Sequence, residues 1–329
     1  MATEQITATD DAAVRRADGR PEAQARRPST EASPAVTRLL DDTSARLRSM
    51  HDKQVHRAPW PEPAEFDVSA YPTPLRRSAA LQWAGRARNE HGSVHQFSQL
   101  LHAFTEARVP AQIMGALARL ITDEVRHAEL CAATALALHP EGEATPAFRF
   151  PLPAAPWEPP PPPGADGDPQ AIFRWATDVV ITACCIGETL SRPMLAAVET
   201  VTTDDYIAGV AAQILRDEHL HATFGWETLG WLVPQLDEAS RRWAQEQLPR
   251  RFAGFERSTA RGVRVEDVAN QAIIIEAGDP ASPNLGTLSK PQYAVIYFAT
   301  FESEILPKLE AVGFDTAWAW GARLPLLEA

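Results

Sequence analysis

Two short segments of the chain place an Asp-Glu pair three residues before a histidine. One segment, Asp123–His127, reads D-E-V-R-H, and the other, Asp217–His221, reads D-E-H-L-H. On a helix, positions i and i+3 point the same way, so each glutamate converges with the histidine that ends its segment. A carboxylate and an imidazole at this spacing can chelate one transition-metal ion. The two segments therefore predict metal-binding chemistry.

Both motifs lie on the apolar stripe of their predicted helix, which is the face that packs into a core. The apolar neighbours at helical spacing are Ile113, Leu117, Leu120 and Ile121 for Glu124, and Val210, Ile214 and Leu215 for Glu218. A buried, unpaired carboxylate is costly, so each glutamate needs a cation or a hydrogen-bond partner. Two Glu-His pairs that meet in one core can be satisfied by metal. The alternative is a polar core in which neighbouring side chains satisfy them without a metal.

Each motif has a further glutamate upstream that also faces a core. Glu90 precedes Glu124 by 34 positions, and Glu188 precedes Glu218 by 30. The apolar residues on the same faces are Trp83, Ala87, Val94, Phe97 and Leu101 for Glu90, and Val180, Ile181, Cys184 and Leu195 for Glu188. The chain thus contains a duplicated helix pair, E…E-x-x-H. Four carboxylates and two imidazoles from four helices make a dinuclear site.

Two of these assignments have competitors. Glu106 can take the place of Glu90, although it lies near a helix end, too close to Glu124 for an antiparallel crossing. Glu188 can instead form an ion pair with Arg192, four residues further along the helix.

The elements that must position these residues are predicted to be helices. Thr73-Pro74, Asp168-Pro169, Asp204 and Asp237 resemble helix starts, since a capping residue or an early proline stands before an apolar period. No segment alternates apolar and polar residues long enough for a strand, so the fold class is all-α. We expect Pro193 to kink the third helix. The predicted helices are 73–108, 110–138, 168–202, 204–232, 237–259 and 289–312.

The domain organisation follows from the same pattern. We expect residues 1–72 to be a disordered tail followed by a Pro-rich approach segment, because they show no apolar period. Residues 73–329 are then one helical domain, with a bundle at about 74–232 and a helical extension at 233–329. The prolines of residues 140–167 form a long crossover between the two helix pairs, and the run Pro159–Pro163 favours an extended segment.

Composition excludes several classes of partner. The net charge of −12 argues against nucleic acid or an anionic membrane surface. The longest strongly apolar stretch, Val179–Gly187, is far shorter than the ~20 residues that cross a bilayer. Three cysteines cannot form a disulfide framework and suit a reducing compartment. We therefore expect a soluble, cytoplasmic protein.

On these motifs the chain resembles the ferritin-like di-iron carboxylate superfamily over about residues 75–232. The resemblance implies a four-helix bundle with two iron ions, or manganese and iron. One metal would be held by Glu90, Glu124 and His127, and the other by Glu188, Glu218 and His221, with one or two carboxylates bridging. It also implies that Asp123 accepts a hydrogen bond from His221 and Asp217 one from His127, which would fix each imidazole's tautomer.

Within this superfamily the residues disfavour several functions. The long crossover and the C-terminal extension do not suit a compact mineralising ferritin subunit. Cys131 stands where the small subunit of ribonucleotide reductase has its radical tyrosine, and no Cys-x-x-Cys pair suggests a rubrerythrin. The layout is most similar to arylamine N-oxygenases and less so to acyl-carrier-protein desaturases, but Ile214 replaces the additional histidine ligand of the N-oxygenases.

The resemblance thus implies an O2-dependent di-iron oxidoreductase, an oxidase or oxygenase that acts on a small organic or carrier-bound substrate. We expect a separate electron-donor protein, because the sequence carries no flavin, nicotinamide or iron–sulfur motif. A homodimer is compatible with this class. The alternative is an iron-binding protein of ferroxidase type, in which the same site oxidises Fe(II) without an organic substrate.

Overall fold

The computed structural model describes residues 44–56, 60–61, 66–139, 159–163, 168–269 and 275–328. Throughout these ranges the regular elements are helices, and no strand occurs in them. The predicted all-α class is therefore confirmed. The predicted tail, residues 1–43, and most of the Pro-rich crossover lie outside the described residues. Pro159–Pro163 is described and is not helical, as the proline run predicted.

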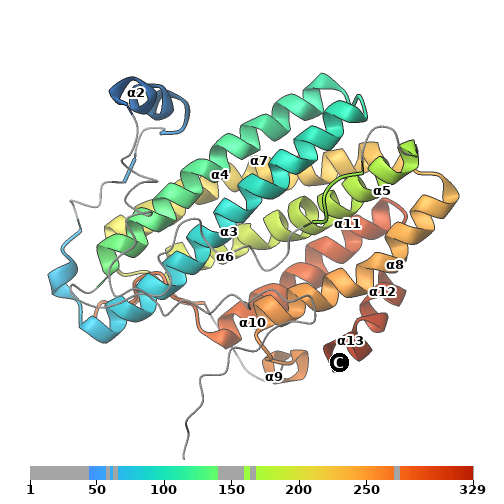
Figure 1. Ribbon diagram of the computed structural model, residues 1–329. Coiled ribbons are helices and arrows are strands. Elements are labelled where there is room, and N and C mark those ends of the chain that lie inside the picture. The colour runs from blue at the N-terminus through green and yellow to red at the C-terminus, as the bar shows by residue number, and fades with distance from the viewer. Residues whose placement is uncertain are drawn as a thin grey trace, which may run out of the picture.

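Four long helical segments lie alongside one another (Figure 1). Neighbouring contacts join α3 to α4, α6 to α7, and α4 to α7. Asp168 and Asp204 begin the third and fourth segments, because their carboxylates accept hydrogen bonds from the amides of Gln170 and Ile207. The four segments are α3 (Thr73–Glu106), α4 (Ala111–Leu138), the run of α5 (Pro169–Val179), η3 (Val180–Gly187) and α6 (Glu188–Val201), and α7 (Asp205–Leu232).

One detail of these helices differs from expectation, and the third segment has an irregularity that the sequence did not indicate. The residue that precedes α3 is Pro72, and Thr73 is already its first helical residue, so Thr73 does not cap the helix. In the third segment the helix continues through Pro193 to Val201. The departure from α-helical hydrogen bonding lies earlier, in the π-helical element η3.

The C-terminal extension is also helical. Contacts join α8 to α5 and α10 to α6, so the extension packs against the third segment. The predicted helix 289–312 is present as three successive elements, which begin with a capping box at Ser289. The elements are η4 (Val233–Gln235), α8 (Glu238–Phe255), η5 (Glu256–Ala260), α9 (Val265–Ala269), α10 (Lys290–Thr300), η6 (Phe301–Ile305), α11 (Leu306–Ala311), α12 (Thr316–Ala322) and α13 (Leu324–Leu327).

Two short helical elements lie within residues 1–72, in the parts of the tail and approach segment that the structure describes. Residues Ala45–Gln54 form α2, and Val68–Ala70 form the short element η2. The apolar pattern missed α2 because none of its residues is buried. The Ser44 side chain caps it by accepting from the Leu47 amide, and side-chain contacts with α4 hold its C-terminal end.

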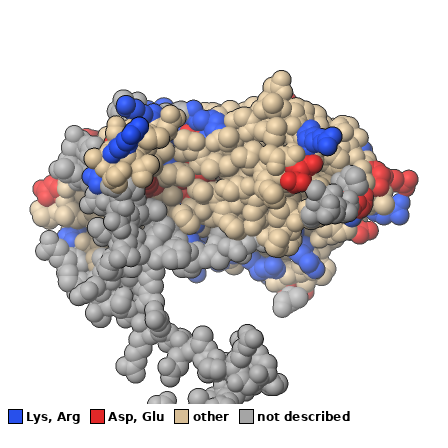
Figure 2. All heavy atoms as spheres, turned by 45° about the horizontal axis from the view of Figure 1, so that its top comes forward, with Lys and Arg blue, Asp and Glu red and all other residues tan. Residues whose placement is uncertain are grey.

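One helix is long and apolar enough to cross a membrane by length and composition, Gln170–Val201. In its most apolar window 67% of the residues are buried inside the protein, where the segment packs against α7 and α8. On the face in Figure 2, charged side chains form small separate groups among uncharged ones, so this face carries no continuous band of one charge.

Candidate metal centre

Six predicted ligands, contributed by all four long segments, come together inside the protein. Donor atoms lie within 4.8 Å of one another in three overlapping groups. The groups share members, so they form one continuous cluster rather than three sites. They are Glu124 with His127 and His221, Glu90 with His127 and Glu218, and Glu188 with Glu218 and His221.

The cluster forms a polar layer between two apolar cores. One core includes Phe97 and Leu120, and the other includes Trp83 and Leu130. Along α3, Trp83 comes before Glu90 and Phe97 comes after it, and the other three segments show the same change of core across their ligand positions. The cluster is therefore enclosed by apolar packing on both sides, which excludes water from it.

Glu124 and Glu218 occupy the middle of the cluster. Glu124 places Oε1 3.0 Å from His221 Nδ1 and Oε2 4.0 Å from His127 Nδ1. Glu218 places Oε1 3.7 Å from His127 Nδ1 and Oε2 3.8 Å from His221 Nδ1. Each glutamate thus presents one oxygen to each histidine, which is the arrangement that two bridging carboxylates require.

Glu90 lies at the His127 end of the cluster. Its Oε2 is 3.8 Å from His127 Nδ1. Glu106, the competing residue, is exposed at the last position of α3 and belongs to none of the three groups. The structure therefore favours Glu90 as the member from α3.

Glu188 lies at the His221 end, with Oε2 3.5 Å from His221 Nδ1. The π-helical element η3 ends immediately before it and so sets its rotation about the helix axis. Arg192, the competing partner, donates to both oxygens of Glu304 at 2.7 and 2.8 Å. Glu188 is therefore directed to the cluster, while Arg192 pairs with the C-terminal extension.

Each aspartate lies beside the histidine of the opposite motif, and one of the two implied hydrogen bonds is present. Asp217 Oδ2 lies 3.2 Å from His127 Nε2, within hydrogen-bonding distance. Asp123 Oδ2 lies 3.7 Å from His221 Nε2, an ion-pair distance. In both rings Nε2 faces an aspartate, and Nδ1 faces the glutamates. A proton on Nε2 therefore leaves the Nδ1 lone pair directed into the cluster.

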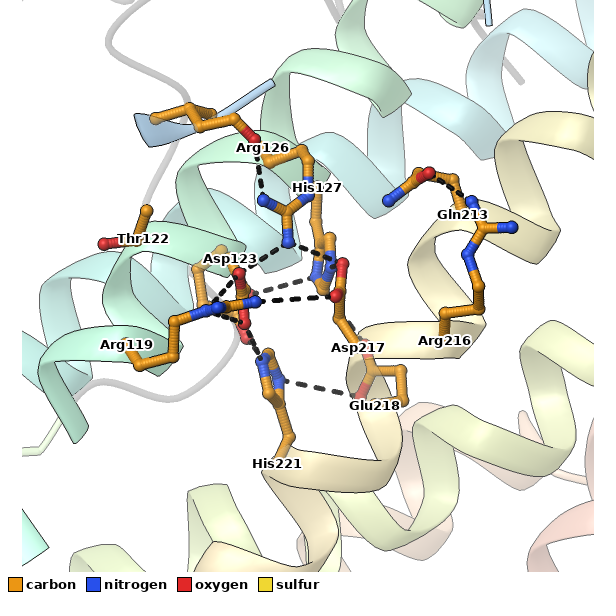
Figure 3. A network of polar contacts seen from close by, with 12 residues as sticks. Arg119, Thr122, Asp123, Arg126, His127, Gln213, Arg216, Asp217, Glu218 and His221 are labelled. Atoms are coloured by element: carbon orange, nitrogen blue, oxygen red, sulfur yellow. Dashed lines mark hydrogen bonds and ion pairs between the residues drawn. The ribbon is translucent and has the colours of Figure 1, made fainter. Parts of the chain in front are cut away.

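A buried arginine joins the two aspartates (Figure 3). One terminal nitrogen of Arg126 donates to Asp123 Oδ1 at 2.5 Å and to Asp217 Oδ2 at 2.6 Å, and the other donates to the Val55 carbonyl at 2.6 Å. Arg119 Nε lies 2.9 Å from both Asp123 oxygens. Sequence reasoning missed both arginines, although they flank Asp123 at helical spacings of four and three, which is the available signal.

The electrostatics of the cluster are unusual for a protein interior. Burial and the charge of Glu188 raise the pKa of Glu124 to about 8, and the same two causes raise the pKa of Glu218 well above its ordinary value. Burial alone would lower the pKa of His127, but the hydrogen bond with Asp217 and the nearby carboxylates of Glu90 and Glu124 raise it to about 9. The raised pKa values of Glu124 and Glu218 mean that burial and neighbouring carboxylates disfavour negative charge on these two side chains.

Several cluster atoms are buried without a hydrogen-bond partner among the residues that the structure describes. They are both carboxylate oxygens of Glu124 and of Glu218, Nδ1 of His127, and both ring nitrogens of His221. Buried polar atoms are normally paired, so a group of this size at one place needs an explanation. Oxygen and imidazole donors that converge between two apolar cores fit a dinuclear transition-metal centre.

Two buried thiols border the cluster. Burial raises the pKa of Cys131, and the charges of Glu90 and Glu124 raise it further. Burial likewise raises the pKa of Cys184, with a contribution from Glu188. Both thiols therefore stay neutral and act as part of the apolar wall.

Comparison of the chain with protein-family models, with curated proteins and with solved structures found no match.

Proposed function

We propose that this protein has a ferritin-like four-helix bundle and is a non-haem di-iron, or manganese–iron, oxidase or oxygenase. Its substrate is a small organic or carrier-bound molecule, and O2 is the oxidant. The observation that carries this proposal is the position of Glu124 and Glu218, each of which faces both histidines while its own oxygens lack hydrogen bonds. A polar core without metal would pair those oxygens instead.

The residues of the chain supply the conditions for such chemistry. Two metal ions held by the six ligands would provide the electrons that activate O2. Asp217 and Asp123 orient the imidazoles so that Nδ1 is the donor atom toward the cluster. The glutamates provide negative charge, and the two apolar cores keep bulk water away from the reacting centre.

Ile214 marks a difference from the arylamine N-oxygenases, because it stands where they have an additional histidine ligand. It is fully buried among apolar residues of α7 and its neighbours, and it offers no donor atom. The proposed centre therefore has six ligands and lacks the seventh that those enzymes use. We propose a cytoplasmic protein that receives electrons from a separate donor protein and binds neither nucleic acid nor membrane.

The test has two steps. The metal content is first measured in protein purified from its native host, and oxygen consumption is then measured with iron-loaded, reduced protein. The control for loss of charge is Glu302→Ala/Glu310→Ala, two exposed glutamates outside the cluster. We expect the wild type and this control to consume O2 and the Glu124→Ala/Glu218→Ala variant to consume none above background.

The substrate arm adds arylamines and acyl thioesters in separate assays. Product formation that depends on O2 and iron supports an oxygenase. Oxygen consumption that matches added Fe(II) and ignores every organic compound would point to ferroxidase activity. Equal consumption by the wild type and Glu124→Ala/Glu218→Ala would contradict the proposed centre itself.

A further inference from the structure

A second group of metal-ligand side chains lies outside the cluster, where α2 meets α4. His51 Nε2 lies 2.9 and 3.0 Å from the two oxygens of Glu129, and His56 Nε2 lies 3.0 Å from Glu129 Oε2. The three donor atoms lie within 4.8 Å of one another. The Glu129 side chain is only 9% exposed, so this carboxylate is largely removed from water.

Carboxylates face both ring nitrogens of His56. Its Nδ1 lies 3.3 Å from Asp52 Oδ1, while its Nε2 lies 3.0 Å from Glu129 Oε2. A neutral imidazole carries one N–H, so in either tautomer one carboxylate faces the ring lone pair. With the N–H directed to Asp52, a cation bound between His56 Nε2 and Glu129 would relieve that repulsion.

We propose that His51, His56 and Glu129 bind one divalent transition-metal ion of the Zn(II) class. Two imidazoles and one carboxylate are a set of three protein ligands found in open zinc sites. Asp52 then accepts from His56 Nδ1 and orients the ring, as carboxylates beside metal-binding histidines do. The competing state is a protonated histidine pair bound to Glu129 with no metal.

This site is separate from the central cluster. Glu129 follows His127 by two positions, which on a helix directs it about 160° away around the axis. His51 lies on α2, His56 is the second residue after α2, and Glu129 lies on α4. None of the three belongs to the central groups. The inference therefore does not require the central cluster to hold metal.

An ion at this position would fasten the N-terminal segment to α4. His56 stacks on Trp60 with ring centroids 3.9 Å apart, and the neighbouring Val55 carbonyl accepts from Arg126. The ligands on α2 and α4 are 73 and 78 residues apart in sequence, so one ion would close a long loop. The segment that it fastens covers the arginine that joins Asp123 and Asp217.

The test is a Zn(II) titration of the full chain, with bound zinc counted after removal of free metal. The background is Glu124→Ala/Glu218→Ala, which weakens zinc binding in the central cluster. In that background we expect one tightly bound zinc per chain, and we expect His51→Ala/His56→Ala to remove it. The matched control is His95→Ala/His102→Ala, two exposed histidines on α3, which should keep the zinc.

Hydrogen exchange provides a second readout that does not depend on the count. Zinc should slow amide exchange in residues 45–56 of the background variant, and His51→Ala/His56→Ala should abolish that slowing. Glu129→Gln, which keeps the size of the side chain, should weaken zinc binding by more than the roughly 10- to 100-fold that loss of a residue behind a ligand costs, because it removes a direct ligand. Zinc retained after His51→Ala/His56→Ala, or no zinc bound in the background at all, would overturn the site. Failure of O2 consumption in the wild type would leave these outcomes unchanged.

Discussion

Asp217 of α7 lies 3.2 Å from Nε2 of His127, a residue of α4. Asp217 directly precedes Glu218, and His127 ends the motif that contains Glu124. Each D-E-x-x-H segment therefore contains two ligand candidates on its own helix and places an aspartate beside the histidine of the opposite helix. This reciprocity gives the aspartate the same position in both segments.

Replacement of Asp217 by asparagine keeps its size and removes its charge. We expect metal affinity to fall by about 10- to 100-fold, because the acceptor that orients His127 loses its negative charge. The folded state should also lose about 1–3 kcal/mol, since Arg126 keeps only Asp123 as a charged partner. Metal titration and denaturant unfolding measure the two effects. Asp205→Asn, an exposed position on the same helix, is the control, and an equal effect there would refute the orienting role.

Arg126 is the cation on which the aspartate pair depends. Arg126→Met should destabilise the protein by about 3–5 kcal/mol, because it leaves two buried carboxylates with only the half-buried Arg119 as a shared cation. The control is Arg242→Met, whose exposed pair with Glu238 contributes about 0–1 kcal/mol. Urea unfolding of both variants provides the comparison. A loss below about 1 kcal/mol for Arg126→Met would show that the pair does not need its cation.

Two glycines of α7 should respond to alanine with opposite signs. A Cβ on Gly225 would lie 2.8 Å from the carbonyl carbon and oxygen of Cys184, in the π-helical element, so backbone must move. We expect Gly225→Ala to destabilise by about 1–3 kcal/mol. Gly230 has open space around it, and Gly230→Ala should stabilise by about 0.5–1 kcal/mol through helix propensity. Thermal unfolding of both variants tests the close approach, and a Gly225→Ala protein as stable as wild type would contradict it.

The metal-free protein should lose stability as the pH rises from about 5 to 9. The pKa of Glu124 rises on folding from 4.5 to about 8, so the folded state holds a proton that the unfolded chain has released. The pKa of His127 rises from 6.5 to about 9, so its contribution is complete below 6.5 and is lost toward 9. Metal must displace these protons, and its affinity should increase over the same range.

Unfolding temperatures measured with a chelator across this pH range test the sign of that dependence. Measurements with bound metal provide the control, because metal ligation replaces both protons. A metal-free protein that becomes more stable between pH 5 and pH 9 would contradict the raised pKa values of Glu124 and His127.

Much of the fold could be predicted because the signals are local. Asp204 and Asp168 cap their helices with their own side chains, and the apolar period sets the face on which Glu124 and Glu218 lie. Two motifs of equal spacing, with one upstream glutamate each on an apolar face, were therefore sufficient to predict that six ligand candidates lie together. The positions of the cross-helix aspartates came from the family resemblance; Asp217 lies at hydrogen-bonding distance from His127, and Asp123 lies 3.7 Å from His221.

The features that were missed depend on contacts between distant parts of the chain. Helix α2 buries none of its residues, so no apolar period predicts it, and its position depends on Glu129. Arg126 stands beside a ligand in sequence, but its role requires Asp217 from another helix. The π-helical element before Glu188 also has no sequence signature, because it depends on how α7 packs at Gly225.

The central claim is that Glu124 and Glu218 bridge two metal ions. Anomalous X-ray scattering at the iron absorption edge, from crystals of iron-loaded protein, locates those ions directly. We predict two peaks about 3.5–4 Å apart. Each peak should be contacted by one oxygen of Glu124, one oxygen of Glu218, and Nδ1 of either His127 or His221. A single peak, or iron bound away from these four side chains, would contradict the account.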